Sequence, residues 1–174
     1  MNFNYAEIHL FLNHLPVLGS LFGFALLAAG LWRKSEELKK AALVLLVVCG
    51  AIAIPVYLTG EPSEEIVEDL PGVSEGYIEE HEESALITLI GIEATALVSL
   101  LGLILARNKG NAPAAITSLC FILALAASLS VAWTAHLGGQ IRHTEIRSNA
   151  QIPVEGDGED DGEDDGEDDG DEDH

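Results

Sequence analysis

A nearly uninterrupted apolar stretch, SALITLIGIEATALVSLLGLILA, covers residues 84–106. It is 23 residues long and carries one charged side chain, Glu93. About 20 apolar residues in a helix cross the ~30 Å hydrocarbon core of a bilayer, and in lipid only a helix satisfies its own backbone hydrogen bonds. The sequence therefore predicts a transmembrane helix from Ser84 to Ala106.

Three other apolar runs accompany this one, and none of them contains a Lys, Arg, Asp or Glu. They cover Ile8–Trp32, Ala41–Leu58 and Ala114–Ala135. Together the four runs predict an all-α fold, an integral membrane four-helix bundle formed by residues 1–150. Small residues are common in membrane helices, but Gly19-x-x-x-Gly23 also has the spacing at which two such helices pack closely.

The chain has a strongly negative net charge and yet a positive mean hydropathy, because its acidic and apolar residues lie in different segments. The 174 residues have a formal net charge of −21 and yet a mean hydropathy of +0.26. Fourteen of the 29 acidic residues lie between Glu155 and Asp173, where Glu-Asp-Asp-Gly repeats three times without a basic residue. Such a run cannot bury a core, so residues 151–174 are predicted to be a disordered acidic tail. The lack of a basic patch excludes nucleic-acid binding.

The basic residues predict the orientation in the membrane. Six of the eight Lys and Arg residues lie in two short connections, residues 33–40 and 107–113. Short loops rich in Lys and Arg face the cytoplasm. The connection of residues 60–83 has ten acidic residues and no basic one. A multi-pass topology follows, with this acidic loop and both termini on the outer side.

The acidic loop is too long for a simple turn. Ser63 is expected to cap a short helix, Glu64–Leu70, that Pro71-Gly72 ends. Ser74 is expected to cap a second helix that continues into the third span. The sequence therefore predicts a helical lid over the outer face.

Histidines gather on the predicted outer side. His174 ends the tail, and five others come from three of the spans or their ends: His9, His14, His81, His136 and His143. Polar side chains at membrane depth are costly unless they are paired or functional. A single interfacial histidine is usually only a solvated polar group, but five on one side favour a site.

Imidazoles that project inward from facing helices build cofactor sites in four-helix proteins. Two neutral imidazoles can hold a haem iron from both faces. We expect His14 and His136 to face each other as axial ligands of a b-type haem, with His9, His81 and His143 in a second site or around the first. One or two haems are compatible with this set, and copper or zinc is the alternative.

Four further residues are candidates for supporting roles around that site. Asn13 is positioned to hold a ring N–H of His14. Gly138 and Gly139 are expected to break or bend the fourth helix and to let a flat macrocycle or another backbone approach. Glu93 is either a proton relay or quinone contact near the midplane, or a protonated carboxyl hydrogen-bonded to a neighbouring helix.

Two histidine motifs carry a family resemblance. HLFLNHLP (residues 9–16) and HLGGQIRH (residues 136–143) resemble the ends of a family of small four-helix bacterial predicted membrane proteins of unknown function. The resemblance covers about Ile8 to Thr144. Some relatives are fused to Rieske-type iron–sulfur domains, which implies redox partners, haem at the histidines and a bacterial inner (cytoplasmic) membrane with periplasmic termini.

The chain departs from the family pattern at three positions. Leu10 and Leu15 replace a proline and a phenylalanine of the first motif, and Ala135 replaces a glycine before the second. Each of the histidines remains in place, so the departures bear more on the family than on the proposed ligands.

These observations predict a membrane electron carrier of the cytochrome b type. Its expected partners are the lipid bilayer, a quinol, and a basic soluble electron carrier or a larger redox complex attracted by the acidic face. No catalytic nucleophile or hydrolytic acid–base set is visible, so no catalytic residue is assigned and a redox subunit is expected rather than a stand-alone enzyme. A copper- or zinc-binding membrane protein and a structural subunit of a larger complex remain alternatives.

Overall fold

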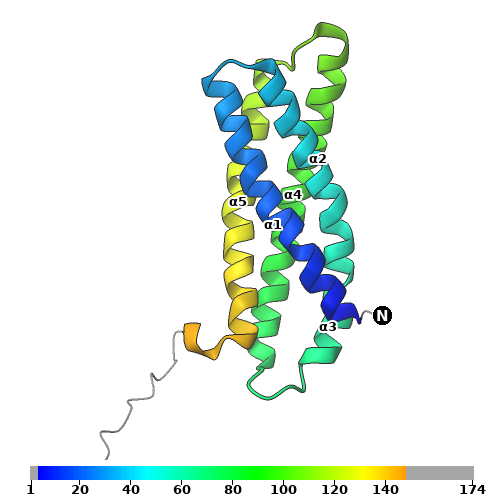
Figure 1. Ribbon diagram of the computed structural model, residues 1–174, viewed down its shortest axis with the longest axis vertical. Coiled ribbons are helices and arrows are strands. Elements are labelled where there is room, and N and C mark those ends of the chain that lie inside the picture. Colours follow the sequence, from blue (N-terminus) through cyan, green and yellow to red (C-terminus); the bar gives the residue numbers. More distant parts are fainter. Residues whose placement is uncertain (1–3, 148–174) are drawn as a thin grey trace, which may run out of the picture.

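The computed structural model describes residues 4–147, apart from the side chains of residues 108 and 109, and this part is helical with no strand (Figure 1). The predicted all-helical class is confirmed. The predicted tail of residues 151–174, with His174, lies outside the described residues. The elements are α1 (Tyr5–Trp32), α2 (Glu36–Leu58), α3 (Gly60–Val67), α4 (Glu75–Lys109), α5 (Ala114–Arg142) and a 3₁₀ turn, η1 (Thr144–Ile146).

Helices α1, α2, α4 and α5 are each long and apolar enough to cross a membrane, as the sequence predicts. They lie side by side, and each runs antiparallel to the one before it (Figure 1). The pairs α1–α2, α2–α4 and α4–α5 pack along much of their length. Contact between α5 and α1 is lighter, because α1 crosses the other helices obliquely. Consequently α1 and α4 stand diagonally opposite each other.

Glycines set the distance between α1 and α2. A Cβ placed on Gly19 would overlap Sγ of Cys49, and one on Gly23 would lie 2.7 Å from Cδ2 of Leu46. Real side chains do not approach that closely, so the two helices are in contact through bare backbone. The predicted close packing at Gly19-x-x-x-Gly23 is confirmed.

The helices extend further at the acidic end than the hydropathy predicts. Helix α4 begins at Glu75, as the predicted helix after Ser74 requires, and α5 continues to Arg142 rather than ending at Ala135. The expected break at Gly138-Gly139 is wrong, because α5 continues through both glycines. A glycine in a helix costs only about 1 kcal/mol, and packing against α4 at Gly138 compensates for it.

Helix α3 follows α2 almost directly and packs against α1 and α2. It starts before the predicted Glu64, so Ser63 is not its N-cap. Instead Ser63 lies inside the helix, and its hydroxyl donates a hydrogen bond to the carbonyl of Thr59. Ser74 does occupy the N-cap position of α4, as predicted. The lid is thus one short helix and a turn leading into α4.

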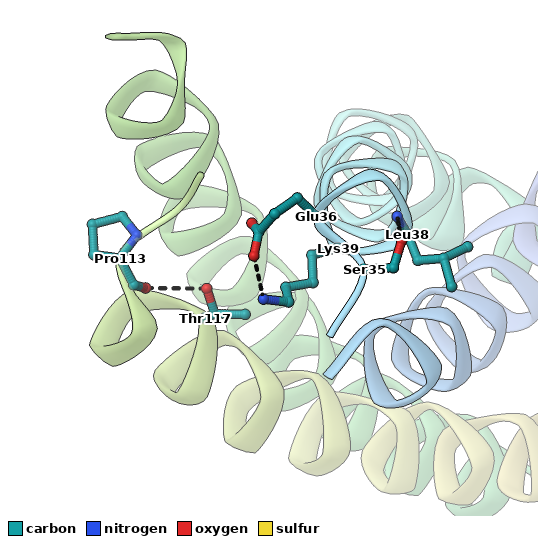
Figure 2. Close-up of polar contacts among 6 residues, drawn as sticks. All are labelled: Ser35, Glu36, Leu38, Lys39, Pro113 and Thr117. Carbon is teal, nitrogen blue, oxygen red and sulfur yellow. Dashed lines mark hydrogen bonds and ion pairs between the residues drawn. The ribbon is translucent and has the colours of Figure 1, made fainter. Parts of the chain in front are cut away.

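Short-range contacts stabilise the opposite, basic end (Figure 2). The hydroxyl of Ser35 accepts a hydrogen bond from the backbone N–H of Leu38 at 3.3 Å and caps α2. Lys39 and Glu36 form an ion pair at 2.7 Å within the first turns of α2. At the start of α5, the hydroxyl of Thr117 donates to the carbonyl of Pro113 at 3.1 Å. The contacts at this end therefore stabilise the first turns of α2 and α5.

Candidate functional site

Five histidines lie toward the end of the molecule that carries the acidic connection. His9 and His14 belong to the start of α1, His81 to the start of α4 and His136 to the end of α5, and His143 follows α5 directly. The antiparallel arrangement brings these helix ends together (Figure 1). Their individual surroundings differ, and these differences decide what each ring can bind.

His9 is partly buried and packs against the end of α2. Its Nδ1 lies 3.0 Å from the carbonyl oxygen of Val56 and 3.2 Å from the hydroxyl of Thr59. A carbonyl only accepts hydrogen bonds, so Nδ1 carries the proton and donates it. In a neutral ring the lone pair is then on Nε2, for which the described residues provide no hydrogen-bond partner.

His81 is partly buried between α4 and α5. Its Nδ1 donates to the carbonyl of Thr134 at 3.0 Å, which again leaves Nε2 as the free nitrogen. The ring occupies the space of a missing side chain on α5, because a Cβ on Gly138 would lie 2.9 Å from its Cε1. Gly138 therefore admits an imidazole, where the sequence predicted a macrocycle or a backbone.

His9 and His81 have the same kind of surroundings at the acidic end of the molecule, since each is partly buried and bonded to a backbone carbonyl. They come from α1 and α4, the diagonally opposite helices. Each ring is oriented by a backbone carbonyl, the arrangement by which proteins fix the tautomer of a metal-ligating histidine.

His14 and His136, the predicted axial pair, both have exposed side chains. Nδ1 of His14 donates to the Leu10 carbonyl at 2.7 Å, so a carbonyl of its own helix orients this ring instead of Asn13. The His136 ring lies 5.8 Å, centroid to centroid, from Trp133. Within residues 4–147 no hydrogen bond or ring contact joins His14 to His136. Their assignment as a ligand pair stays a prediction.

His143 is exposed and lies just outside the last long helix. Its Nδ1 is 2.8 Å from Oε1 of Glu145. A hydrogen bond from its own backbone, followed by the one from His143, lowers the pKa of the Glu145 carboxyl. His143 thus stabilises the turn after α5.

The arrangement of donor side chains at this end bears on the predicted cofactors. In the part of the chain that the structure describes, no three His, Cys, Asp or Glu side chains come together as a group able to hold a metal ion. A haem iron needs only two axial imidazoles. Rings that donate through Nδ1 and leave Nε2 free have the tautomer that such ligation requires.

A chain of hydroxyls joins α4 to α5 below His81. Oγ of Ser84 lies 2.6 Å from the hydroxyl of Thr134, which lies 2.8 Å from that of Thr88, and Thr88 lies 2.5 Å from Oγ of Ser130. Thr134 therefore contacts His81 through its carbonyl and this network through its hydroxyl. The sequence analysis missed the network, although hydroxyl residues four apart on one helix face carry the signal.

A cavity of about 440 Å³ lies beside this network on the flank of α4 and α5. It is lined by Glu80, Glu83, Ser84, Ile87, Ser130, Trp133 and Leu137. The two carboxylates would repel the propionates of a haem, so the cavity suits a different occupant.

Glu93 projects from the middle of α4 toward Gly50 of α2. Its carboxylate oxygens lie 3.4 and 3.6 Å from where a Cβ on Gly50 would stand. Oε1 is fully buried and has no hydrogen-bond partner among the described residues. The predicted hydrogen bond to a neighbouring helix is thus not made by this oxygen. The proton-relay and quinone-contact interpretations of Glu93 stay predictions.

Arg147 fastens the end of α5 to the acidic connection. Its guanidinium donates to the carbonyls of Gly72 and Gln140 at 2.8 Å and of Ile141 at 2.9 Å. The same group stacks 4.5 Å above the ring of Tyr77 in α4. These contacts hold the surroundings of His143 and His81 in place.

The chain matches no protein-family model, no curated protein and no solved structure in the three comparisons made. Its chemistry is therefore inferred from the histidines, the hydroxyl network and the cavity themselves.

Proposed function

We propose that the chain is an integral membrane four-helix bundle that holds a b-type haem near its outer, acidic end and transfers electrons there. The proposal combines the membrane-spanning potential of four helices with the paired histidines at one end. It keeps the expected role of an electron carrier or redox subunit rather than a stand-alone enzyme.

Apolar exposure supports insertion into a bilayer. Only about a third of each candidate span is buried by the protein itself. Large apolar side chains cover the remaining surface; Phe11 is 77% exposed and Ile87 67%. Water-soluble monomers rarely expose continuous apolar surface on this scale. Lipid contact accounts for such a surface, and the basic residues at the opposite end favour a cytoplasmic location for that end.

The observation that carries the haem proposal is the matched environment of His9 and His81. Two partly buried imidazoles on diagonal helices each donate Nδ1–H to a backbone carbonyl, which leaves Nε2 of each ring available as a ligand. We therefore favour His9 and His81 as the axial pair, with His14 and His136 as the alternative pair from the sequence. Bound between two imidazoles, haem supplies a one-electron redox centre.

The acidic end suits a basic electron-accepting partner. Nine of the ten acidic residues of the connection 60–83 are exposed, and Glu64 is half-buried. Complementary charge mainly raises the rate of encounter, and salt weakens it. A quinol from the bilayer is the proposed electron donor. The resemblance to small bacterial membrane proteins places the chain, in this proposal, in an inner membrane with periplasmic termini.

Optical spectroscopy of the purified protein tests the haem proposal. Protein from haem-replete cells is expected to show a shifted Soret band and a sharp α-band after dithionite reduction. His9→Ala and His81→Ala should each abolish these bands, whereas His143→Ala should leave them unchanged.

Two outcomes separate the ligand pairs and the cofactors. Loss of the bands in His14→Ala and His136→Ala, with retention in His9→Ala and His81→Ala, would replace the favoured pair. A wild-type protein without haem bands but with stoichiometric copper or zinc in metal analysis would refute the haem proposal in favour of the metal-binding alternative.

A further inference from the structure

The cavity between α4 and α5 has the size and lining of a ligand site. Its volume of about 440 Å³ falls within the roughly 300–1,000 Å³ typical of small-molecule pockets. Its walls combine two carboxylates, two hydroxyls, an indole and two aliphatic side chains. Such a lining suits a ligand with a flat apolar ring and a few polar substituents.

The hydroxyls in the cavity are held in place before any ligand arrives. Ser84 and Ser130 stand at the two ends of the hydrogen-bonded chain that passes through Thr134 and Thr88. Both ends line the cavity. Because a hydroxyl either donates or accepts, these two groups can meet the oxygen atoms of a ligand in either role. Binding there requires little reordering of side chains.

The cavity faces sideways, toward the position of the lipid. Two of its walls, Ile87 and Trp133, are 67% and 59% exposed. Exposed apolar side chains continue from them along the same helices, with Ile90 and Leu97 on α4 and Leu129 on α5. A ligand dissolved in the bilayer can therefore enter from the side, with its tail along this apolar surface.

The carboxylates decide which membrane molecule fits. Glu80 and Glu83 repel the phosphate of an anionic lipid. A carboxylate only accepts hydrogen bonds, so it selects a ring that carries hydroxyl donors. The indole of Trp133 offers an aromatic surface for that ring.

We propose that this cavity binds the head group of a membrane hydroquinone. Its hydroxyls donate to Glu80 and Glu83, Ser84 and Ser130 complete the hydrogen bonds, and the ring lies against Trp133. The choice of a redox-active ring rests on the electron-transfer function proposed above. The oxidised quinone has only carbonyl acceptors, which carboxylates do not bind, so the reduced form binds more tightly.

Tryptophan fluorescence locates the site, because the chain has two tryptophans at opposite ends. Trp32→Phe leaves Trp133 in the cavity as the reporter, and Trp133→Phe leaves Trp32, which is 84% exposed at the basic end. Titration of full-length protein in micelles with decylubiquinol should quench Trp133 saturably and Trp32 only in proportion to added quinol. Equal, non-saturating quenching of both would overturn the proposal.

Titration calorimetry with decylubiquinol and decylubiquinone tests the selectivity. The reduced form should bind roughly tenfold more tightly, the factor expected for a hydrogen bond to a charged group. Glu80→Gln with Glu83→Gln should remove this preference, and Ser130→Ala should weaken both forms. Tighter binding of dodecyltrimethylammonium than of decylubiquinol would show a cation site and overturn the proposal.

The absorption spectrum of the same preparation separates the two proposals. Haem bands without saturable decylubiquinol binding would refute the hydroquinone site and leave the electron-transfer function standing. Saturable binding that favours the reduced form, in protein without haem bands, would support the site and refute the haem-based function.

Discussion

Helices α1 and α2 pack through glycines, whereas α4 and α5 pack through hydroxyls and an imidazole. Gly19 and Gly23 bring α2 against bare backbone. Across the other interface, Thr134 bonds to His81, Ser84 and Thr88. Close packing at the glycines supplies van der Waals contact but no side-chain hydrogen-bonding groups. A polar interface of similar length positions hydroxyl and imidazole groups that can exchange hydrogen bonds with a ligand.

The largest predicted loss of stability comes from a substitution in the glycine interface between α1 and α2. Gly19→Leu forces a side chain into Cys49, and overpacking of this kind costs about 1–3 kcal/mol. Thermal unfolding in detergent should show a clearly lower midpoint. Gly76→Leu is the matched control, since a Cβ there meets nothing closer than Ser74 Oγ at 4.0 Å. Equal midpoints for the two variants would contradict a supporting role for α1–α2.

A smaller and more local effect is expected at the polar interface. Gly138→Ala places a methyl group 2.9 Å from Cε1 of His81, so the ring must turn and lose its bond to Thr134. The loss should be about 1 kcal/mol, with a lower haem content under the function proposed above. Gly139→Ala gains the same helix propensity and meets only Ile146 at 3.4 Å. Indistinguishable variants would show that the contact of Gly138 with His81 has no consequence.

The smallest predicted effect is a pH-dependent change in the stability of α3, which lies at the acidic end. Partial burial, then a hydrogen bond with Glu82 and repulsion by nearby carboxylates, raises the pKa of Glu64 in α3. A raised carboxyl pKa means that the protonated form stabilises the fold at low pH. This contribution is lost as the pH rises through the raised pKa.

Hydrogen exchange of the α3 amides as a function of pH measures this contribution. Protection, corrected for intrinsic exchange rates, should fall as the pH rises past the ordinary range for a glutamate. Glu64→Gln should remove the dependence, and Glu68→Gln, an exposed neighbour, should keep it. Persistence of the full pH dependence in Glu64→Gln would assign it to another group.

Hydropathy predicted the four long helices because each apolar run is close to the roughly 20 residues that cross a bilayer. It underestimated α5 at the acidic end, since polar residues such as Arg142 extend a helix without extending its apolar run. The glycine pair misled the prediction of a break, because a glycine inside a helix costs only about 1 kcal/mol, which a tertiary contact can offset. For Gly138 that contact is His81, a residue distant in sequence.

The histidines as a set were identifiable from sequence, but their pairing was not. Depth along a helix follows from residue number, which made His14 and His136 natural partners. Which rings face each other depends also on the rotation of each helix about its axis, and residue number does not give that rotation. The hydroxyls of Thr88 and Ser130 meet for the same reason, through helix rotations that no single-chain pattern specifies.

The carboxyl of Glu93, set against Gly50 in the middle of α4, lies within the electric field across the membrane in the proposed orientation. A full elementary charge moved across a bilayer costs about 2.3 kcal/mol for each 100 mV of membrane potential. In that orientation, a charged ligand that entered the bundle to this depth would cross roughly half of that field, or about 1 kcal/mol for each 100 mV.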